Sequence, residues 1–253
     1  MAKILKLFQS FSEGDNYMIY DRQQTILKYL KQHKTATIKE LAELVWASES
    51  SVRRDIKVLE QKGCVTQVYG GVLLPEYANS VIPISLRDTS NSTVKDSISK
   101  EAAKHIFNGA TIFMDGSSTV KRIVKHINSF KELKIITNNQ LVFSECTNPD
   151  VSLYCTGGHF DSQSHIFLGS DAEKYIENIN ADIVFFSSQA ISNDGEISDV
   201  SEKETSLRRK MLTRANKKIF LCDSSKLGLK KTFTLCTKDD IDVIICDKKL
   251  PWE

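Results

Sequence analysis

The sequence lacks any apolar run long enough to cross a membrane, because no segment approaches the ~20 apolar residues that a spanning helix needs. Its first residues, Met1 to Met18, combine basic and apolar character. Lys6, Gln9 and Ser10 interrupt the apolar stretch that a signal peptide would require. We therefore expect a cytoplasmic protein with no membrane among its partners, in which residues 1–18 form an N-terminal extension.

The sequence also lacks the residue spacings of metal and nucleotide sites. Its six cysteines include no C-x-x-C pair, and no pair of histidines accompanies them at zinc-finger spacing. Neither G-x-x-x-x-G-K-[ST] nor G-x-G-x-x-G occurs, so neither a P-loop nor a dinucleotide fingerprint is present. We expect no metal and no cofactor, and we expect the cysteines to be reduced thiols.

No excess of one charge marks the chain as a whole, whose formal net charge is +2 over 253 residues. The balance is uneven, however. Residues 1–75 hold 11 Lys and Arg against 8 Asp and Glu, and the remainder holds 23 against 24. A length of 253 residues with 41% hydrophobic residues allows two folded domains. A slightly basic first domain on a near-neutral body fits a DNA-binding module, although the charge alone proves little.

Three short amphipathic helices are predicted in the N-terminal part. The first runs from about Asp21 to His33. The second opens at Thr37, whose hydroxyl forms a capping box with the carboxylate of Glu40. The third begins after Ser48 and stops near Gly63, which can take the left-handed conformation of a helix end.

Two β-prone runs flank Gly70-Gly71 after the third helix and predict a hairpin. Three helices, the last with a polar and basic first turn, and a hairpin describe a winged helix-turn-helix at residues 19–74. The alternative is an ordinary three-helix subdomain whose charged residues form a solvated face. The residues expected to contact base edges or phosphates are Thr37, Ser48, Ser50, Ser51, Arg53, Arg54, Lys57, Gln67 and Tyr69.

Residues 75–92 hold two of the four prolines and little periodic apolar pattern, so we expect an inter-domain linker there. In residues 93–253, six short apolar runs each end in small polar residues. Near-continuous apolar strands separated by helical segments predict an α/β domain with a mostly parallel sheet. The runs are 111–114, 134–136, 151–155, 183–186, 219–222 and 243–246.

Ligands of parallel sheets bind beyond the carboxyl ends of the strands, where these polar clusters lie. Hydroxyls, free backbone N–H groups and a lysine suit a phosphate. For any single cluster, turn formation or helix capping is the better interpretation, but several clusters at one predicted edge favour a site. They comprise Asp115, Gly116, Ser117, Ser118 and Thr119, then Thr137, Asn138 and Asn139, and finally Asp223, Ser225 and Lys226.

Residues Ser48 to Glu60 match the pattern S-x-x-T-[IV]-R-R-D-L-x-x-L-E except at Ser51 and Ile56, and Val68-Tyr69-Gly70-Gly71-Val72 follows at the wing. In these segments the chain resembles the DeoR family of transcription regulators. The resemblance continues through the polar clusters of the C-terminal domain. It adds Gly157, Gly158, Glu204 and Arg208 to the expected effector site, and it implies a domain similar in fold to ribose-5-phosphate isomerase.

The resemblance implies a DNA-binding transcription regulator. We expect a repressor of a sugar-metabolism operon that is relieved by a phosphorylated sugar bound in the C-terminal domain. One helix-turn-helix covers only a few base pairs of double-stranded DNA, so we expect a homo-oligomer, either a dimer or a tetramer. Residues 93–253 are expected to carry both effector sensing and oligomerisation.

Two departures from the family pattern bear on catalysis. The loop after the fourth apolar run reads Ser187-Ser188-Gln189-Ala190, and Arg208 stands where a lysine is frequent. The alternative function is an active sugar-phosphate isomerase fused to a DNA-binding domain, which would need a carboxylate base. Related isomerases carry acidic residues in this loop, and this chain has none there, so we expect no catalysis. A DNA-architectural protein without a ligand is a third alternative, against which the polar strand ends argue.

Overall fold

The computed structural model describes residues 13–68, 71–75, 84–89 and 91–252. The chain divides into two compact units, Met1–Asn79 and Ser80–Glu253, which we call the head and the sensor. This division falls inside the predicted linker, residues 75–92. Among the described residues, no helix is long and apolar enough to cross a membrane.

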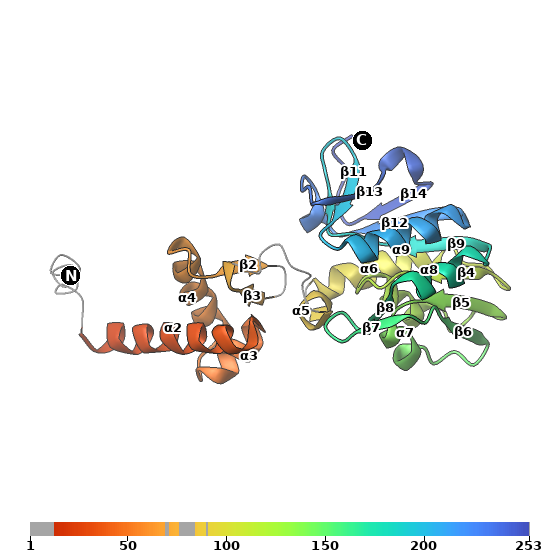
Figure 1. Ribbon diagram of the computed structural model, residues 1–253. Coiled ribbons are helices and arrows are strands. Elements are labelled where there is room, and N and C mark those ends of the chain that lie inside the picture. The colour runs from red at the N-terminus through yellow and green to blue at the C-terminus, as the bar shows by residue number, and fades with distance from the viewer. Residues whose placement is uncertain (1–12, 69–70, 76–83, 90, 253) are drawn as a thin grey trace. The chain divides into compact units, whose positions relative to one another are not determined.

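The head combines helices with a small antiparallel sheet (Figure 1). Its core is formed by fully buried apolar side chains of the helices, among them Ile26, Leu30, Leu41, Val52 and Ile56. The strands pair in the order β1-β3-β2, so the predicted winged helix-turn-helix is confirmed. The elements are α2 (Glu13–His33), β1 (Thr35–Thr37), α3 (Ile38–Leu44), α4 (Glu49–Gln61), β2 (Thr66–Val68) and β3 (Gly71–Leu73).

The predicted starts of α3 and α4 and the predicted stop of α4 are confirmed. Thr37 and Glu40 form the capping box of α3, and Ser48 caps α4 by accepting a hydrogen bond from the backbone N–H of Ser51. Gly63 follows α4 with φ +70°, a conformation that costs glycine little. Two features differ from expectation: α2 begins at Glu13 rather than near Asp21, and β1 was not predicted. A three-residue strand is too short to show an alternating pattern.

The sensor is built on a six-stranded sheet in the order β14-β12-β9-β4-β5-β6, and every neighbouring pair is parallel. Each strand contains one of the six predicted apolar runs, so the predicted α/β class with a mostly parallel sheet is confirmed. The strands are β4 (Thr111–Met114), β5 (Leu133–Thr137), β6 (Val151–Cys155), β9 (Ala181–Phe186), β12 (Ala215–Cys222) and β14 (Val243–Cys246).

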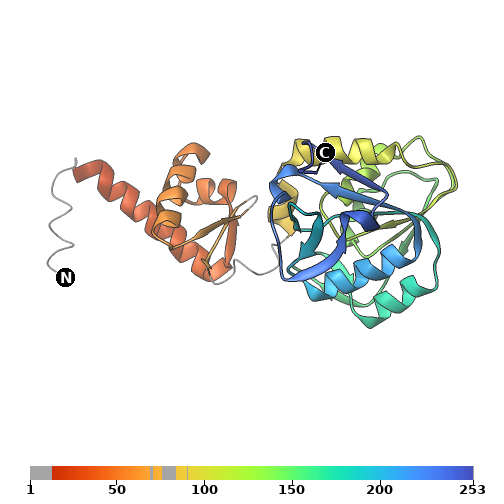
Figure 2. The same ribbon diagram turned by 90° about the horizontal axis from the view of Figure 1, so that it is seen from above.

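Helices cover both faces of this sheet (Figures 1 and 2). Alternate residues of β4 show the two layers, because Ile112 and Met114 belong to one apolar core and Phe113 to the other. The first core includes α6 (Ser92–Ala103), the 3₁₀ helix η3 (Val120–His126) and α7 (Gln140–Glu145). The second includes α8 (Ser170–Glu177) and α9 (Glu202–Thr213).

Several short elements of the sensor were not predicted. A helix, α5 (Ile84–Thr89), lies inside the predicted linker. The remainder are a hairpin of β7 (His159–Asp161) and β8 (Ile166–Leu168), a sheet of β10 (Ala190–Ile191), β11 (Glu196–Asp199) and β13 (Phe233–Thr237), and the 3₁₀ helices η4 (Ser224–Lys226) and η5 (Lys238–Asp240).

The strand order fixes where a ligand is expected. The chain adds β5 and β6 on one side of β4, and later adds β9, β12 and β14 on the other side. The topology therefore switches direction between β4 and β9. In open parallel sheets ligands bind beyond the carboxyl ends of the strands at such a switch point, which here lies beside Asp115 and Ser187.

Candidate functional site

The exposed start of α4 carries most of the expected DNA-contacting residues. Ser48, Ser50, Arg53, Arg54 and Lys57 are exposed, and Ser51 is half-buried. The hydroxyl of Ser48 lies 2.9 Å from the hydroxyls of both Ser50 and Ser51. Arg53 has one long ion pair to Glu49 (3.4 Å), and Arg54 reaches the hydroxyl of Ser51 at 3.5 Å. These weak exposed contacts leave the arginines available to a partner.

Two other expected DNA contacts of the head have partners within the head. The Thr37 side chain caps α3, and the Gln67 side chain donates to the carboxylate of Glu60 (2.8 Å), which ties β2 to α4. Tyr69 lies outside the described residues. Asp55 of the Arg-Arg-Asp motif is buried and accepts a hydrogen bond from Arg22 (2.5 Å), and this bond raises the pKa of Arg22 although burial opposes it. Asp55 therefore holds α2 to α4.

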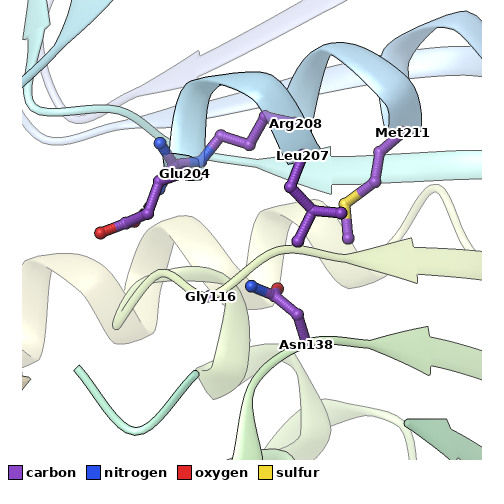
Figure 3. Close-up of a pocket in the computed structure, with 6 residues that line it drawn as sticks. All are labelled: Gly116, Asn138, Glu204, Leu207, Arg208 and Met211. Carbon is purple, nitrogen blue, oxygen red and sulfur yellow. Dashed lines mark hydrogen bonds and ion pairs between the residues drawn. The ribbon is translucent and has the colours of Figure 1, made fainter. Parts of the chain in front are cut away.

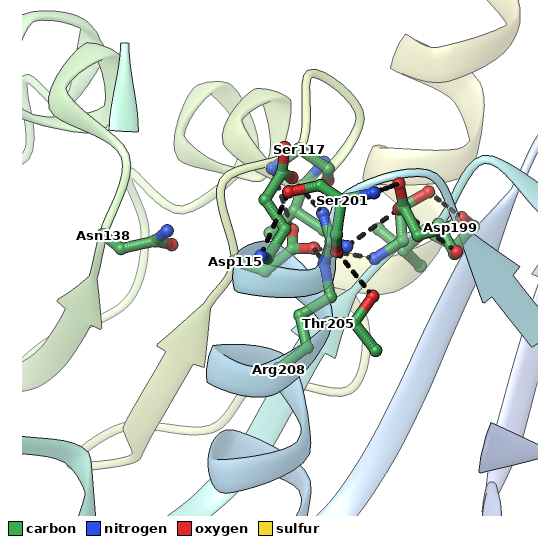
Figure 4. A network of polar contacts seen from close by, with 12 residues as sticks. Asp115, Ser117, Asn138, Asp199, Ser201, Thr205 and Arg208 are labelled. Atoms are coloured by element: carbon green, nitrogen blue, oxygen red, sulfur yellow. Dashed lines mark hydrogen bonds and ion pairs between the residues drawn. The ribbon is translucent and has the colours of Figure 1, made fainter. Parts of the chain in front are cut away.

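In the sensor, one buried arginine organises the carboxyl end of the sheet (Figure 4). Arg208 donates to Asp115 (2.7 Å), Asp199 (2.9 Å) and Glu204 (2.6 Å), and all four side chains are at most 4% exposed. Burial would lower the pKa of Arg208, but the three carboxylates raise it on balance. Burial also raises the pKa of Glu204, against the opposing effect of Arg208. We call these residues the carboxylate cluster.

Asp115 connects the carboxylate cluster to two loops at the switch point. Besides the guanidinium of Arg208, its carboxylate accepts the backbone N–H groups of Ser117 (3.0 Å) and Ser187 (3.2 Å). It therefore fastens the loop after β4 to the loop after β9. A side chain with all these internal partners positions other groups and has little capacity left for a ligand.

A narrow hollow adjoins the carboxylate cluster (Figure 3). The empty space between its lining residues amounts to about 160 Å³, but no point in it is wide enough for a water molecule. Its polar lining includes the Asn138 side chain, whose Oδ1 is buried without a hydrogen-bond partner. A buried acceptor left unpaired costs roughly 1–3 kcal/mol, which a ligand donor could recover. The lining residues are Gly116, Asn138, Glu204, Leu207, Arg208 and Met211.

A second cluster, rich in cations, lies at the ends of β4, β9 and β12. Lys226 donates to the hydroxyl of Ser187 (2.8 Å) and lies 3.6 Å from the carboxylate of Asp223. Lys95 of α6 donates to the hydroxyl of Ser118 (3.3 Å) and to the backbone carbonyl of Arg87 in α5. We call Arg87, Lys95, Ser118, Ser187, Asp223 and Lys226 the cation cluster.

The pKa values show that the members of the cation cluster interact strongly. Burial, together with the charge of Lys226, lowers the pKa of Lys95 to about 7, against the opposing effect of Asp223. Burial would raise the pKa of Asp223, but Lys226 holds it below its usual value. The guanidinium atoms Nε and Nη2 of Arg87 and the hydroxyl of Thr119 are buried without hydrogen-bond partners. Such unpaired donors beside an excess of cations suit an anion.

The remaining expected effector residues serve mainly in turns and close packing. Thr137 accepts from the backbone N–H of Asn139, and Asn139 caps α7. Gly116 and Gly158 allow close approach, because a Cβ on either would lie 2.6 Å from Ile166 or from the carbonyl of Leu168. Gly157 lies after β6, and Ser225 is exposed and donates to Asp223.

Sequence reasoning missed several members of these clusters. Asp199, Leu207 and Met211 join the site only through the fold. Lys95 did leave a signal, since it shares a helical stripe with Ser99 and Ala102, and a lysine on a buried stripe needs a partner. Arg87 fell in the predicted linker and left none.

Comparisons with known proteins place the head and the sensor in the same family. Residues 22–77 match the model of a DeoR-like helix-turn-helix domain, and residues 90–248 match that of a DeoR C terminal sensor domain. The chain is 32% identical to the HTH-type transcriptional regulator GolR of Listeria innocua over 91% of both chains. It is 28% identical to the HTH-type transcriptional repressor GlcR of Bacillus subtilis, over 90% of this chain and 88% of that protein.

Among solved structures, a ribose 5-phosphate isomerase from Methanocaldococcus jannaschii matches 55% of each chain at 16% identity, with a TM-score of 0.40.

Proposed function

Because this chain belongs to the DeoR family of helix-turn-helix transcription regulators, we propose that it represses a sugar-metabolism operon and releases its operator when a phosphorylated sugar binds in the sensor. One observation carries the proposal: the cation cluster and the carboxylate cluster adjoin each other at the switch point between β4 and β9. A sugar phosphate carries the two complementary groups, an anion at one end and hydroxyls along the rest.

The cation cluster supplies the phosphate end of this site. Lys95 interacts with the cations Lys226 and Arg87 and with the carboxylate of Asp223, and Arg87 also interacts with Glu204. Burying like charges together is costly, and a phosphate would relieve that cost through charge-assisted hydrogen bonds. The hydroxyls of Ser118 and Ser187 would complete its surroundings.

The hollow beside the carboxylate cluster supplies the sugar end. Carboxylates and amide oxygens accept hydrogen bonds from hydroxyls, and Glu204 and Asn138 present such oxygens there. Leu207 and Met211 would pack against the carbon face of the sugar. The hollow is closed in the present conformation, so the binding of a sugar must move α9 or the loops beside it.

The helix α5 offers a route from this site toward the head. It begins directly after residues 76–83, which connect the two units, and its last turn is fastened to the site. The carbonyl of Arg87 accepts from Lys95 and Ser118, and Asp88 accepts from Lys121 (3.0 Å) and Arg122 (3.0 Å). A phosphate that takes the donors Lys95 and Ser118 would release that carbonyl. We infer a coupling of about 1–3 kcal/mol between ligand and operator, typical of such linkage.

Isomerase activity stays the alternative, and the structure alters the reasoning about it. The loop at residues 188–190 has no acid of its own, but Asp199 lies 3.3 Å from the hydroxyl of Ser188. Acids are therefore present. Each is bonded to the guanidinium of Arg208 inside the protein, so none can act as a base without giving up that bond. We therefore favour binding over catalysis.

Thermal shift with a panel of pentose and hexose phosphates tests the effector, with the unphosphorylated sugars as controls. We expect at least one phosphosugar to raise the melting temperature and to weaken operator binding in a gel shift. Lys226→Ala should abolish both responses and spare operator binding. Lys230→Ala removes an exposed lysine that pairs with Glu196 and should change neither. A normal response in Lys226→Ala contradicts the assigned site, and turnover of any phosphosugar contradicts the choice of function.

A further inference from the structure

One side chain of the head is exposed far more than its chemistry favours. Trp46, in the turn between α3 and α4, is 96% exposed, whereas the next most exposed large apolar residue of the described chain, Phe107, reaches 53%. An indole surrounded by water gains none of the apolar burial that stabilises a fold. Trp46 therefore adds nothing visible to the packing of the head.

The backbone at Trp46 is unfavourable as well. Its φ is +51°, in the left-handed region where a bulky side chain crowds the following carbonyl. Glycine or asparagine would fill this turn with less strain. A residue that is strained and also unpacked stabilises nothing in the isolated head, and retained strain of this kind points to a function.

The turn holds Trp46 rigidly beside the start of α4. The backbone N–H groups of Val45 and Ala47 donate to the carbonyls of Leu41 (3.1 Å) and Ala42 (3.0 Å). Two residues later Ser48 caps α4. Any surface that meets the first turn of α4 therefore comes within reach of the indole.

We propose that Trp46 is a DNA-backbone contact, in which the indole packs on a deoxyribose and its Nε1–H donates to a phosphate oxygen when α4 enters the major groove. This inference rests on the proposed DNA reading by α4. An indole has one donor and a flat apolar face, which match a phosphate oxygen and the sugar beside it. Trp46 would add affinity without reading sequence.

The charges around Trp46 fit this contact. A shallow hollow next to the indole is lined by Lys39, Ala42, Glu43, Ala47 and Glu49. The two acids in it each lie near a cation, Glu43 near Lys39 (4.0 Å) and Glu49 near Arg53 (3.4 Å), which offsets their repulsion of the duplex. A protein partner could also use an exposed indole, but the position beside the cap of α4 favours DNA.

The first experiment measures operator affinity against salt, with a duplex selected from a random-sequence pool by the full-length protein. Trp46→Gly should weaken binding about five- to ten-fold, the worth of one neutral hydrogen bond with its packing. The salt dependence should keep its slope because no charge is lost, whereas Arg54→Ala should lower the slope by about one phosphate contact. Phe107→Ala, which removes an exposed aromatic of the sensor, should leave binding unchanged.

The melting temperature of Trp46→Gly should not fall together with its operator affinity. Relief of the left-handed strain should leave the melting temperature equal to that of the wild type or higher by a few degrees, while affinity falls. A merely structural tryptophan would lower both. Wild-type affinity in Trp46→Gly overturns the inference. If Arg54→Ala also binds normally, the proposed DNA reading by α4 fails with it.

A second measurement does not depend on the folding of that variant. Trp252 is the other tryptophan, and it packs against the second core of the sensor, so Trp252→Phe leaves Trp46 as the sole tryptophan to be excited. Addition of the selected duplex should protect Trp46 from acrylamide quenching. Unchanged quenching at saturating DNA overturns the inference and leaves a protein partner as the use of this surface.

Discussion

Arg53 on α4 and Arg208 on α9 occupy helices of similar length, 13 and 12 residues, but meet opposite surroundings. The side chain of Arg53 is 64% exposed and has one long ion pair, whereas that of Arg208 is 4% exposed and is bonded to three carboxylates. The head thus presents polar groups whose few contacts are weak and exposed, so that DNA could replace them. The sensor pairs most of its polar groups internally, so a ligand there must exchange bonds rather than simply add them.

The largest expected effect comes from removing the buried arginine. Arg208→Ala leaves three buried carboxylates without a cation, and breaking a buried pair typically costs about 3–5 kcal/mol. We expect the sensor to unfold at much lower urea concentration while the head keeps its own transition. Urea unfolding followed by the fluorescence of Trp252, in a variant lacking Trp46, reports on the sensor, and helical circular dichroism adds the transition of the head. A change of less than about 1 kcal/mol in the sensor would contradict the role of Arg208.

Replacement of the exposed arginine of the head, Arg53, by alanine should weaken DNA binding and leave stability unchanged. Arg53→Ala should cost about 1–3 kcal/mol of operator binding free energy and relax sequence preference, because a base-edge contact is lost. Its melting temperature should stay near that of the wild type. Titration of the selected duplex and of single-base variants measures both parts. Loss of affinity equal on every sequence would reassign Arg53 to the phosphate backbone.

The cation cluster should make the sensor respond to pH. The folded pKa of Lys95 is about 7 against an ordinary 10.5, because burial and Lys226, with lesser effects of Arg122 and Arg87 and opposed by Asp223, penalise the charged form. Between these pH values the unfolded chain holds a proton that the folded chain has lost, so the free energy of unfolding should rise with pH.

A bound phosphate should reverse this effect on Lys95, because it favours the charged amine. Phosphosugar affinity should therefore fall as the pH rises above about 7, with proton uptake seen by calorimetry in buffers of different ionisation enthalpy. Lys95→Met should remove the proton uptake. Affinity that increases from pH 7 to 9 would show that Lys95 does not face the phosphate.

The smallest effect is expected at Gln67. Its side chain donates to Glu60, and its backbone N–H keeps a second bond to the same carboxylate (2.8 Å) after truncation. Gln67→Ala should change stability and operator affinity by no more than about 0.5 kcal/mol. A loss comparable to that of Arg53→Ala would mean that Gln67 leaves Glu60 to contact DNA, and the contrast between the two positions would disappear.

Most of the fold could be predicted from local patterns in the sequence. The six strands of the sheet were predictable because each contains a short apolar run. The starts of α3 and α4 were predictable because Thr37 and Ser48 cap them through neighbours in the chain. The strands β1 and β10 and the helix α5 were not predictable. They have six residues or fewer, too few to show a period, and they depend on contacts with distant segments.

The site was predictable only in part for a related reason. The loop residues after the strands could be found, since strand ends gather at one edge of a parallel sheet. Tertiary bonds decide which of them can face a ligand. Asp115 is bonded to Arg208, and Lys95 and Arg87 belong to helices outside the predicted clusters. Burial and pairing cannot be inferred from spacing alone.

The bond between Asp115 and Arg208 spans 93 residues of chain, which has a consequence during synthesis. At ordinary ribosome speeds of about 5–20 residues per second, Arg208 is synthesised roughly 5–20 seconds after Asp115. The head is complete well before then. A message cut short between these two codons would therefore yield a polypeptide with its helix-turn-helix intact and its effector site unbuilt. We expect such a product to show no response to an effector. A ribosome stalled in this interval should hold a chain in which the carboxylate of Asp115 lacks its partner Arg208.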